Sequence, residues 1–360
     1  MTHNFQEMFM RLLKSLLAVL VLSFSTAAWC ADKGAPLLIA APPNPNVFPL
    51  LVALEENPDL PVRLLPVADN KGIDAAFKQG ADGLLAMTYT SAEKAASGKI
   101  PDLELQGVYY WRGFFEMTVP EVHGFADLRG KGLIVSGPVS GGRGGGPDHF
   151  FQAALKRSGF TPGDFNICYL PVKRGLALLD DGKPMNTEKA CGGQESASGI
   201  LLVEPAASGL LLKSAIPFAM DRKVHRAIDL QKLFGGYKAW GPDELPHGGF
   251  AIRRSALENP ARKAQIAAFV AAYKAAVDRI NASDGMFSRM RLGWIISKGM
   301  EKYYGQFHVN PSAMVVARAI ENGEMRFRTD RPMSGIRADL DSFLKEVLGG
   351  TVPATFYPEK

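Results

Sequence analysis

The chain has 360 residues, of which 47% are hydrophobic and 21% charged, a balance that indicates a globular protein long enough for two lobes. The formal net charge is only +5, and no stretch of Lys and Arg is dense enough to indicate binding to nucleic acid. We therefore expect a folded protein with no nucleic-acid partner.

The first thirty residues have the pattern of a cleaved signal peptide. Arg11 and Lys14 precede an apolar run over 15–24, which is too short to cross a bilayer, and small residues follow as far as Ala28. The tripeptide Ala28-Trp29-Cys30, which stands before Ala31, resembles a small-x-small site for signal peptidase. Residues 1–30 are therefore predicted to be removed, and the mature protein to be exported to a periplasm.

Export changes how the cysteines are interpreted. If Cys30 leaves with the signal peptide, Cys168 and Cys191 remain as an even pair in an oxidising compartment. A disulfide and two free thiols are both open, and two cysteines without a neighbouring His are a poor metal site, so no metal or cofactor is predicted. A lipid anchor on Cys30 is the alternative to cleavage, although the bulky Trp29 departs from the small residue that a lipobox requires.

From Pro36 onward the chain alternates strand-like and helix-like segments. The pattern predicts strands at 37–40, 61–66, 83–87 and 103–108, and helices at 47–56, 73–79 and 91–97. This alternation favours an α/β fold with doubly wound, mainly parallel sheets. A connecting strand at 114–119 leads into a second series, with helices at 125–128, from Pro147 onward and at 173–180, and strands at 133–136, 166–170 and 200–203. The polar stretch 182–199 has no clear period and is predicted to be a loop.

The chain is expected to return to the first lobe from about Ile216. There it adds a strand at 249–253 and long helices at 260–280, 311–322 and 334–348. The predicted lobes are 36–113 together with 216–360, and 119–215. Two α/β lobes joined by crossing strands favour capture of a ligand in a cleft by hinge closure.

The most distinctive stretch is a glycine-rich loop over 137–146, which lies between an apolar strand and a helix opened by Pro147. Such a turn directs backbone N–H groups and the positive end of the helix dipole at one point, and Arg143 adds a bidentate donor. An anion or a polar head group is predicted to bind there. Gly137 and Gly142 have the spacing of a P-loop, but Arg143 follows where Lys is required, which excludes that nucleotide motif. A merely flexible surface loop is the alternative.

Ligands of open α/β sheets bind beyond the carboxyl ends of the strands, and this rule selects four loops. The predicted ligand-binding residues are Asn44, Asn46, Thr88, Tyr89, Thr90, Ser136, Ser140, Gly141, Gly142, Arg143 and Glu204. The carboxylate of Glu204 disfavours a doubly charged ligand. No serine elbow, HExxH or paired-acid motif stands out, so no catalytic residue and no enzymatic activity are predicted.

Several short motifs also occur in a suggestive order. They are QGAD at 79–82, FADLRGK at 125–131, LKRSGFTPG at 155–163, VEP at 203–205 and GGFAIR at 248–253. Together they resemble the periplasmic solute-binding proteins of the ABC importers for aliphatic sulfonates, nitrate and thiamine pyrimidine precursors. The resemblance implies a two-lobed type II periplasmic-binding fold, with a hinge between the lobes and no catalysis. It also implies a monomer that delivers a small polar or anionic organic solute to an ABC permease in the inner membrane.

Some features depart from that family, and two other functions stay open. Ser198 and Gly199 replace the acidic residue and alanine that usually open the strand before Glu-Pro. A ligand-sensing module is one alternative, and it requires a fused or partner signalling domain. The other is an enzyme like the self-consuming pyrimidine synthase on a related fold, but that family binds iron through a cysteine cluster, which three dispersed cysteines do not match.

Overall fold

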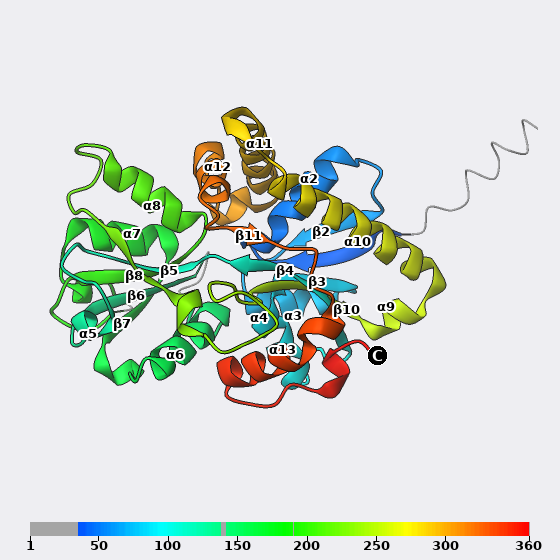
Figure 1. Ribbon diagram of the computed structural model, residues 1–360, viewed down its shortest axis with the longest axis horizontal. Coiled ribbons are helices and arrows are strands. Elements are labelled where there is room, and N and C mark those ends of the chain that lie inside the picture. Colours follow the sequence, from blue (N-terminus) through cyan, green and yellow to red (C-terminus); the bar gives the residue numbers. More distant parts are fainter. Residues whose placement is uncertain (1–34, 138–141, 190, 360) are drawn as a thin grey trace, which may run out of the picture. The chain divides into compact units, whose positions relative to one another are not determined.

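The computed structural model describes residues 35–137, 142–189 and 191–359, and Leu37–Lys360 forms one compact unit (Figure 1). The first of its two sheets has the strand order β11-β4-β10-β3-β1-β2. The strands are β1 (Leu37–Ala41), β2 (Val62–Pro66), β3 (Gly83–Met87), β4 (Leu103–Arg112), β10 (Gly248–Arg253) and β11 (Arg326–Phe327). β1 runs parallel to β2 and β3, whereas β10 lies antiparallel between β3 and β4. The sheet is therefore mixed rather than mainly parallel.

Helices cover both faces of this sheet. The helices α2, α10 and α11 lie on one side of it in Figure 1, and α3, α4 and α13 lie on the other. Their bounds, with those of their neighbours, are η2 (Pro45–Val47), α2 (Phe48–Glu56), α3 (Asn70–Lys78), α4 (Thr88–Ala96), α9 (Arg254–Glu258), α10 (Pro260–Asn281), α11 (Gly285–Tyr304), η6 (Gly305–Phe307), α12 (Ala313–Glu321), α13 (Met333–Leu348) and η7 (Ala354–Phe356). The side chains of Asp69 and Asn259 cap α3 and α10, respectively.

The second sheet has the strand order β7-β6-β8-β5-β9. Its strands are β5 (Phe114–Thr118), β6 (Gly132–Gly137), β7 (Asn166–Pro171), β8 (Ala197–Val203) and β9 (His225–Asp229). The helical segments around it are α5 (Phe125–Leu128), α6 (Gly146–Arg157), η3 (Pro162–Asp164), α7 (Val172–Asp181), η4 (Met185–Thr187), α8 (Ala206–Ala215) and η5 (Leu230–Leu233). β9 pairs with β5. The chain therefore still belongs to the second sheet at residue 229, beyond the expected return at Ile216.

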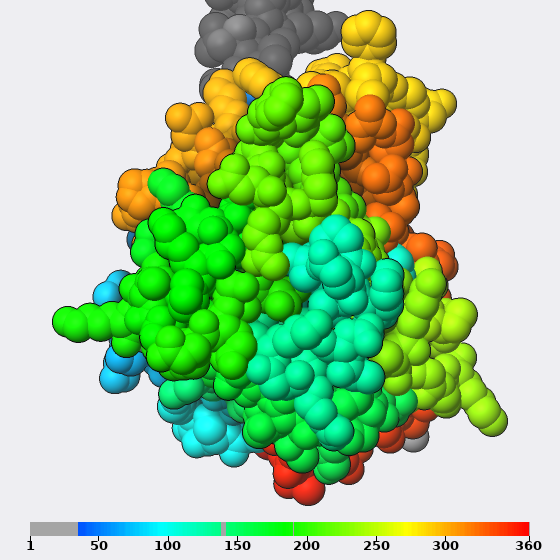
Figure 2. All heavy atoms as spheres, turned by 90° about the vertical axis from the view of Figure 1, so that its left-hand side faces the viewer, coloured from blue at the N-terminus to red at the C-terminus, as the bar shows by residue number. Residues whose placement is uncertain are grey.

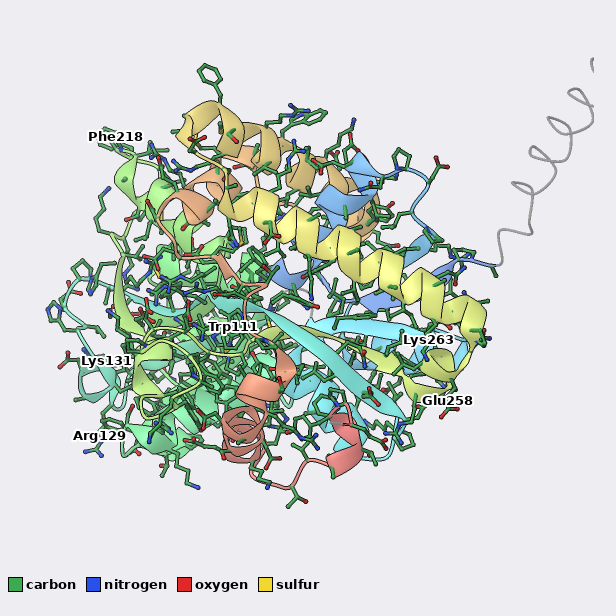
Figure 3. All side chains as sticks on the ribbon, turned by 45° about the vertical axis from the view of Figure 1, so that its right-hand side comes forward. Trp111, Arg129, Lys131, Phe218, Glu258 and Lys263 are labelled. Carbon is green, nitrogen blue, oxygen red and sulfur yellow. A yellow bond between two sulfur atoms is a disulfide. The ribbon has the colours of Figure 1, made fainter. Side chains whose placement is uncertain are left out.

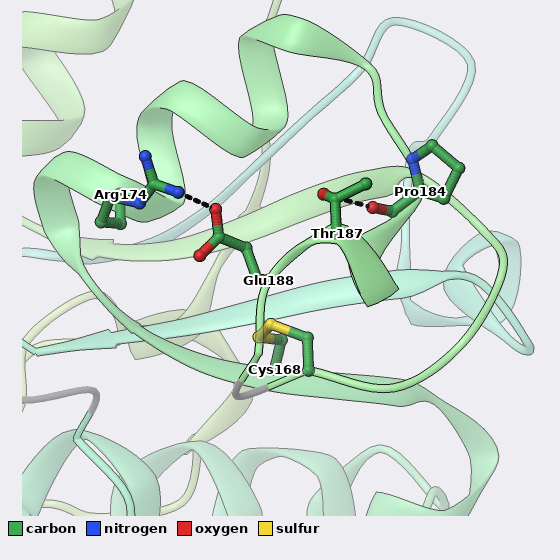
Figure 4. The surroundings of a disulfide bond; sticks show 6 residues. Cys168, Arg174, Pro184, Thr187 and Glu188 are labelled. Atoms are coloured by element: carbon green, nitrogen blue, oxygen red, sulfur yellow. Dashed lines mark hydrogen bonds and ion pairs between the residues drawn. A yellow bond between two sulfur atoms is a disulfide. The ribbon is translucent and has the colours of Figure 1, made fainter.

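A disulfide joins Cys168 on β7 to Cys191, with their Cα atoms 5.1 Å apart (Figure 4). It resolves the alternatives left open for these two cysteines. The stretch predicted as a plain loop also has internal structure, because Pro184 and Ser196 form a β-bridge and Glu188 pairs with Arg174. The disulfide thus ties this segment to the edge strand of the second sheet.

The chain crosses between the sheets at Gly113, directly between β4 and β5. A Cβ atom at this position would lie 1.6 Å from the hydroxyl oxygen of Tyr110, so only glycine fits. The side chain of Gln231 holds the crossing: its Oε1 accepts from the Phe114 N–H at 2.7 Å, and its Nε2 donates to the Phe114 carbonyl at 2.9 Å. Trp111, just before the crossing, is fully buried and lies in the interior in Figure 3.

Candidate ligand-binding site

A cavity of about 370 Å³, which we call the interlobe pocket, lies where strands of both sheets end. Segments after β1, β2 and β3 line it from the first sheet, and segments after β6 and β7, together with the end of β8, line it from the second. Its polar lining includes Asn44, Asp69, Asn70, Lys71, Thr90, Ser136 and Arg143. Three of the four loops that the strand-end rule selected therefore reach this pocket, and binding of a ligand there stays a prediction.

The interlobe pocket carries two cations on opposite walls. Lys71 comes from the first turn of α3, and Arg143 comes from the loop after β6. Both are exposed, and neither has an ion-pair partner in the part of the chain that the structure describes. The guanidinium of Arg143 lies 4.6 Å from the centre of the Tyr169 ring, a cation–π contact. The nearby Asp69 carboxylate accepts from the Lys71 and Gly72 N–H groups, so the charged side chains that line the pocket are two cations and one hydrogen-bonded carboxylate.

Lys71 is absent from the residues predicted to bind ligand. A usable signal exists, because Asp69 is an N-cap placed just after a strand. The first turn of such a helix lies at the same sheet edge as the other strand ends.

Five of the predicted residues line the interlobe pocket: Asn44, Thr90, Ser136, Gly142 and Arg143. Two of them also hold the local backbone. Oδ1 of Asn44 accepts from the Asn46 N–H at 2.9 Å and starts η2, and the Ser136 hydroxyl donates to the Leu201 carbonyl. Contact of these five residues with a ligand stays a prediction.

Three predicted residues lie behind the wall of the pocket, fully buried. Nδ2 of Asn46 donates to the carbonyls of Ala86 and Gly249, and the Thr88 hydroxyl donates to the Pro246 carbonyl. Tyr89 stacks on Phe150, with 6.1 Å between ring centroids. Burial also raises the pKa of the Tyr89 hydroxyl well above its usual value. These residues join the elements around the pocket instead of lining it.

The loop predicted over 88–90 is the first turn of α4, which begins directly after β3. Among the other predicted residues, Ser140 and Gly141 lie outside the described residues.

The start of α6 differs from its prediction as a set of open donors. The Asp148 carboxylate accepts from the Gly144 N–H at 2.8 Å, and the Gly145 N–H donates to the Gly142 carbonyl at 3.0 Å. The same carboxylate accepts from the Tyr169 hydroxyl at 2.9 Å. The Asp148 carboxylate therefore occupies part of the N-terminal end of α6, and Arg143 remains as a cationic donor that lines the pocket.

Glu204 lines a second, adjoining cavity instead of the interlobe pocket. Its carboxylate is fully buried, accepts from the N–H and hydroxyl of Ser208 at 3.1 Å each, and pairs with Arg226 at 3.0 Å. Burial raises the pKa of Glu204 to about 7, against the opposing effect of its hydrogen bonds and of Arg226. A carboxylate tied in this way does not repel a ligand in the interlobe pocket as strongly as a free one.

The described residues contain no group of three or more His, Cys, Asp and Glu side chains placed to hold a metal ion. None of their helices combines the length and apolar character needed to span a bilayer.

No protein-family model matches the sequence, and no curated protein matches it. Solved structures match over most of the chain. An ABC transporter from Parabacteroides distasonis is 16% identical, with a TM-score of 0.59 over 91% of this chain and 100% of that one. A Candida albicans gene product with the generic periplasmic binding protein fold is 13% identical, with a TM-score of 0.55 over 90% and 96%. The periplasmic nitrate-binding protein of Synechocystis PCC 6803 is 15% identical, with a TM-score of 0.52 over 82% and 74%.

The chain has the periplasmic binding protein fold. The predicted two-lobed type II form of this fold is confirmed. The interlobe pocket receives segments from both sheets, and so does the adjoining cavity that Glu204 lines.

Proposed function

We propose that this protein is an exported solute-binding protein that captures a small polar or anionic organic solute in the interlobe pocket and delivers it to an ABC import permease. The observation that carries the proposal is the pair of cations facing one cavity from different sheets, Lys71 from the first and Arg143 from the second. A solute held by both would join the two lobes.

The charge of the pocket favours an anionic group on the solute. Both cations are exposed to solvent within the cavity, while the nearest carboxylates, Asp69 and Asp148, are already hydrogen-bonded to backbone N–H groups. A hydrogen bond between ionised groups contributes about 1.5–3 kcal/mol. Arg143 in particular offers a planar fork that fits a carboxylate or a sulfonate.

The crossing between the sheets supports capture by closure. The chain crosses at Gly113 and returns through the segment 230–247, and the Leu245 N–H donates to the Trp111 carbonyl at 2.7 Å. Arg112 also pairs with Asp229 of the second sheet at 2.6 Å. A short crossing held by few backbone bonds is where hinge rotation would concentrate.

Location and partners complete the proposal. The signal pattern at 1–30 supports export to a periplasm, and the protein would act there as a monomer beside an ABC permease. A ligand-sensing module remains the alternative. Association with a signalling protein instead of a permease would favour it. An iron enzyme of the pyrimidine-synthase kind finds no support among the described cysteines, since Cys168 and Cys191 are bonded to each other.

The deciding experiment looks for the solute directly. Protein purified from the periplasm is analysed by native mass spectrometry, and the mass that it carries is identified after denaturation. The expected result is an anionic organic molecule that is lost from the Lys71→Ala, Arg143→Ala double variant and retained by Lys263→Ala, Arg291→Ala. The control positions are exposed on α10 and α11 and line neither cavity. A cationic molecule, or equal retention by both variants, would overturn the proposal.

A further inference from the structure

A second cavity of about 680 Å³ adjoins the interlobe pocket, and we call it the apolar chamber. It lies between α7 and α8 on one side and η2, α2, α11 and α12 on the other. In Figure 2, α8 and the residues after it lie in front of α11 and α12. The apolar side chains of its lining include Phe48, Leu176, Leu210, Met220, Met300 and Val315.

Most of the charge around the apolar chamber is already paired. Arg174 pairs with Glu188, and Lys213 pairs with Asp180 at 3.1 Å. The buried carboxylate of Glu204 is held by Arg226 and Ser208. The walls therefore suit a hydrocarbon surface and offer few groups to a charged one.

The apolar chamber is bounded by packed helices. A Cβ atom on Gly209 of α8 would lie 3.2 Å from Cγ1 of Val315 on α12, so these two helices already touch. The apolar walls gain dispersion contacts when an apolar group lies between them.

The two cavities adjoin, because Asn44, Val172 and Val203 line both of them. A molecule that passes these three residues would place one end in the interlobe pocket and the other end in the apolar chamber. A single inorganic oxyanion would fill only a small part of this space.

We infer that the solute is an amphipathic organic anion, whose anionic group lies between Lys71 and Arg143 and whose extended apolar body fills the apolar chamber. This inference rests on the proposed function and narrows it. The cations give orientation, and the apolar chamber gives most of the affinity through buried hydrocarbon surface.

Calorimetric titration with acetate, hexanoate, decanoate and decanol tests the inference. Affinity is expected to rise roughly three- to fourfold per added methylene from acetate to decanoate. Decanol, which lacks the anionic group, is expected to bind more weakly than decanoate. Equal affinities along the acid series would overturn the inference. If none of the acids binds, the inference is overturned as well. The proposed function would then be tested on its own by the mass-spectrometric search for a carried solute.

A variant that fills the apolar chamber gives the second test. Ala206 lines the apolar chamber at the start of α8 and does not line the interlobe pocket, so Ala206→Phe should reduce decanoate affinity at least tenfold and leave acetate affinity unchanged. Ala261→Phe is the matched control, because Ala261 is exposed at the start of α10. Thermal unfolding confirms that both variants are folded. Unchanged decanoate affinity in folded Ala206→Phe would mean that the apolar body of the solute lies elsewhere. An equal loss of acetate affinity and decanoate affinity would mean that the substitution had disturbed the anion site. Either result contradicts the inference.

Discussion

The Asp148 carboxylate accepts the Gly144 N–H at 2.8 Å and the Tyr169 hydroxyl at 2.9 Å, and the ring of Tyr169 in turn lies against the guanidinium of Arg143. Asp148 is almost fully buried. This arrangement links the glycine loop, β7 and the proposed anion-binding side chain.

Replacing Asp148 with Ala should destabilise the protein. The change leaves the Gly144 N–H and the Tyr169 hydroxyl without their acceptor. An unsatisfied buried donor costs about 1–3 kcal/mol, and because both donors are only partly buried here, the loss should lie near the lower end of that range. Asp148→Asn keeps an oxygen at the position and should lose less. Urea unfolding of the two variants measures the difference. Equal unfolding free energies for wild type and Asp148→Ala would show that the carboxylate does not hold the loop.

Arg143→Ala should weaken binding of the solute about ten- to hundredfold, because it removes a charge-assisted hydrogen bond of about 1.5–3 kcal/mol. Folding should change little, since Arg143 is exposed on a loop. Arg143→Lys should recover only part of the affinity, because the charge remains and the planar fork does not. Calorimetry at two salt concentrations measures all three proteins. Equal affinities with equal salt dependence would remove Arg143 from the site.

Binding should also make the protein more compact, since Lys71 and Arg143 reach one cavity from different sheets. Small-angle scattering at a saturating solute concentration should give a smaller radius of gyration than without solute. Arg143→Ala at the same concentration should show less compaction. An unchanged radius for the saturated wild type would contradict closure.

Glu116 provides a pH dependence of stability. Its side chain is fully buried on β5, and neither carboxyl oxygen has a hydrogen-bond partner among the described residues. Burial raises the pKa of Glu116 well above its usual value, so the folded protein keeps this proton when the unfolded chain has lost it. The contribution of this group is therefore fully present below the unfolded pKa and decreases as pH rises, by at most about 1.4 kcal/mol per pH unit.

Glu116→Gln should remove that part of the pH dependence. Urea unfolding between mildly acidic and mildly basic pH should show wild type losing stability relative to the variant as pH rises. Glu121→Gln is the matched control, because Glu121 is exposed. A difference between wild type and Glu116→Gln that is flat, or that changes in the opposite direction, would show that this carboxyl is not held neutral.

Removal of the disulfide should lower stability. Cys168 and Cys191 are separated by 23 residues, and a bond that closes a loop of this size contributes roughly 3 kcal/mol in the chain-entropy account. The double variant Cys168→Ala, Cys191→Ala should therefore melt at a lower temperature than the oxidised wild type. A reducing agent should lower the melting temperature of wild type and leave the double variant unchanged. Equal melting temperatures in all conditions would mean that the bond does not constrain the chain.

Local patterns in the sequence determined much of the fold. The apolar runs that became β3 and β6 are buried along their lengths, and that of β1 is buried except at Leu38. The rule that ligands lie beyond strand ends selected Arg143 and Ser136, and both line the interlobe pocket because their distance from a strand end is a property of the chain.

Other features depend on contacts that the sequence does not display. The helix α11 was missed because it contains Gly293 and Gly299, which lower helix propensity. A Cβ on Gly293 would lie 2.2 Å from the Ala313 carbonyl, and one on Gly299 would lie 3.1 Å from Leu51, so these glycines serve close packing between helices. The strand β9 was missed because it is a charged edge strand with a single buried residue, Ile228.

The pairing of charges was likewise decided only in three dimensions. Nothing in the local sequence shows that Asp148 would occupy the mouth of its own helix, or that Glu204 would pair with Arg226. Lys71 and Arg143 are separated by the whole β3 to β6 segment, and only the crossing at Gly113 brings them to one cavity. Chain neighbours determine helices and strands because those depend on local hydrogen bonds and periodicity, whereas the charges that meet in a pocket depend on how two sheets pack.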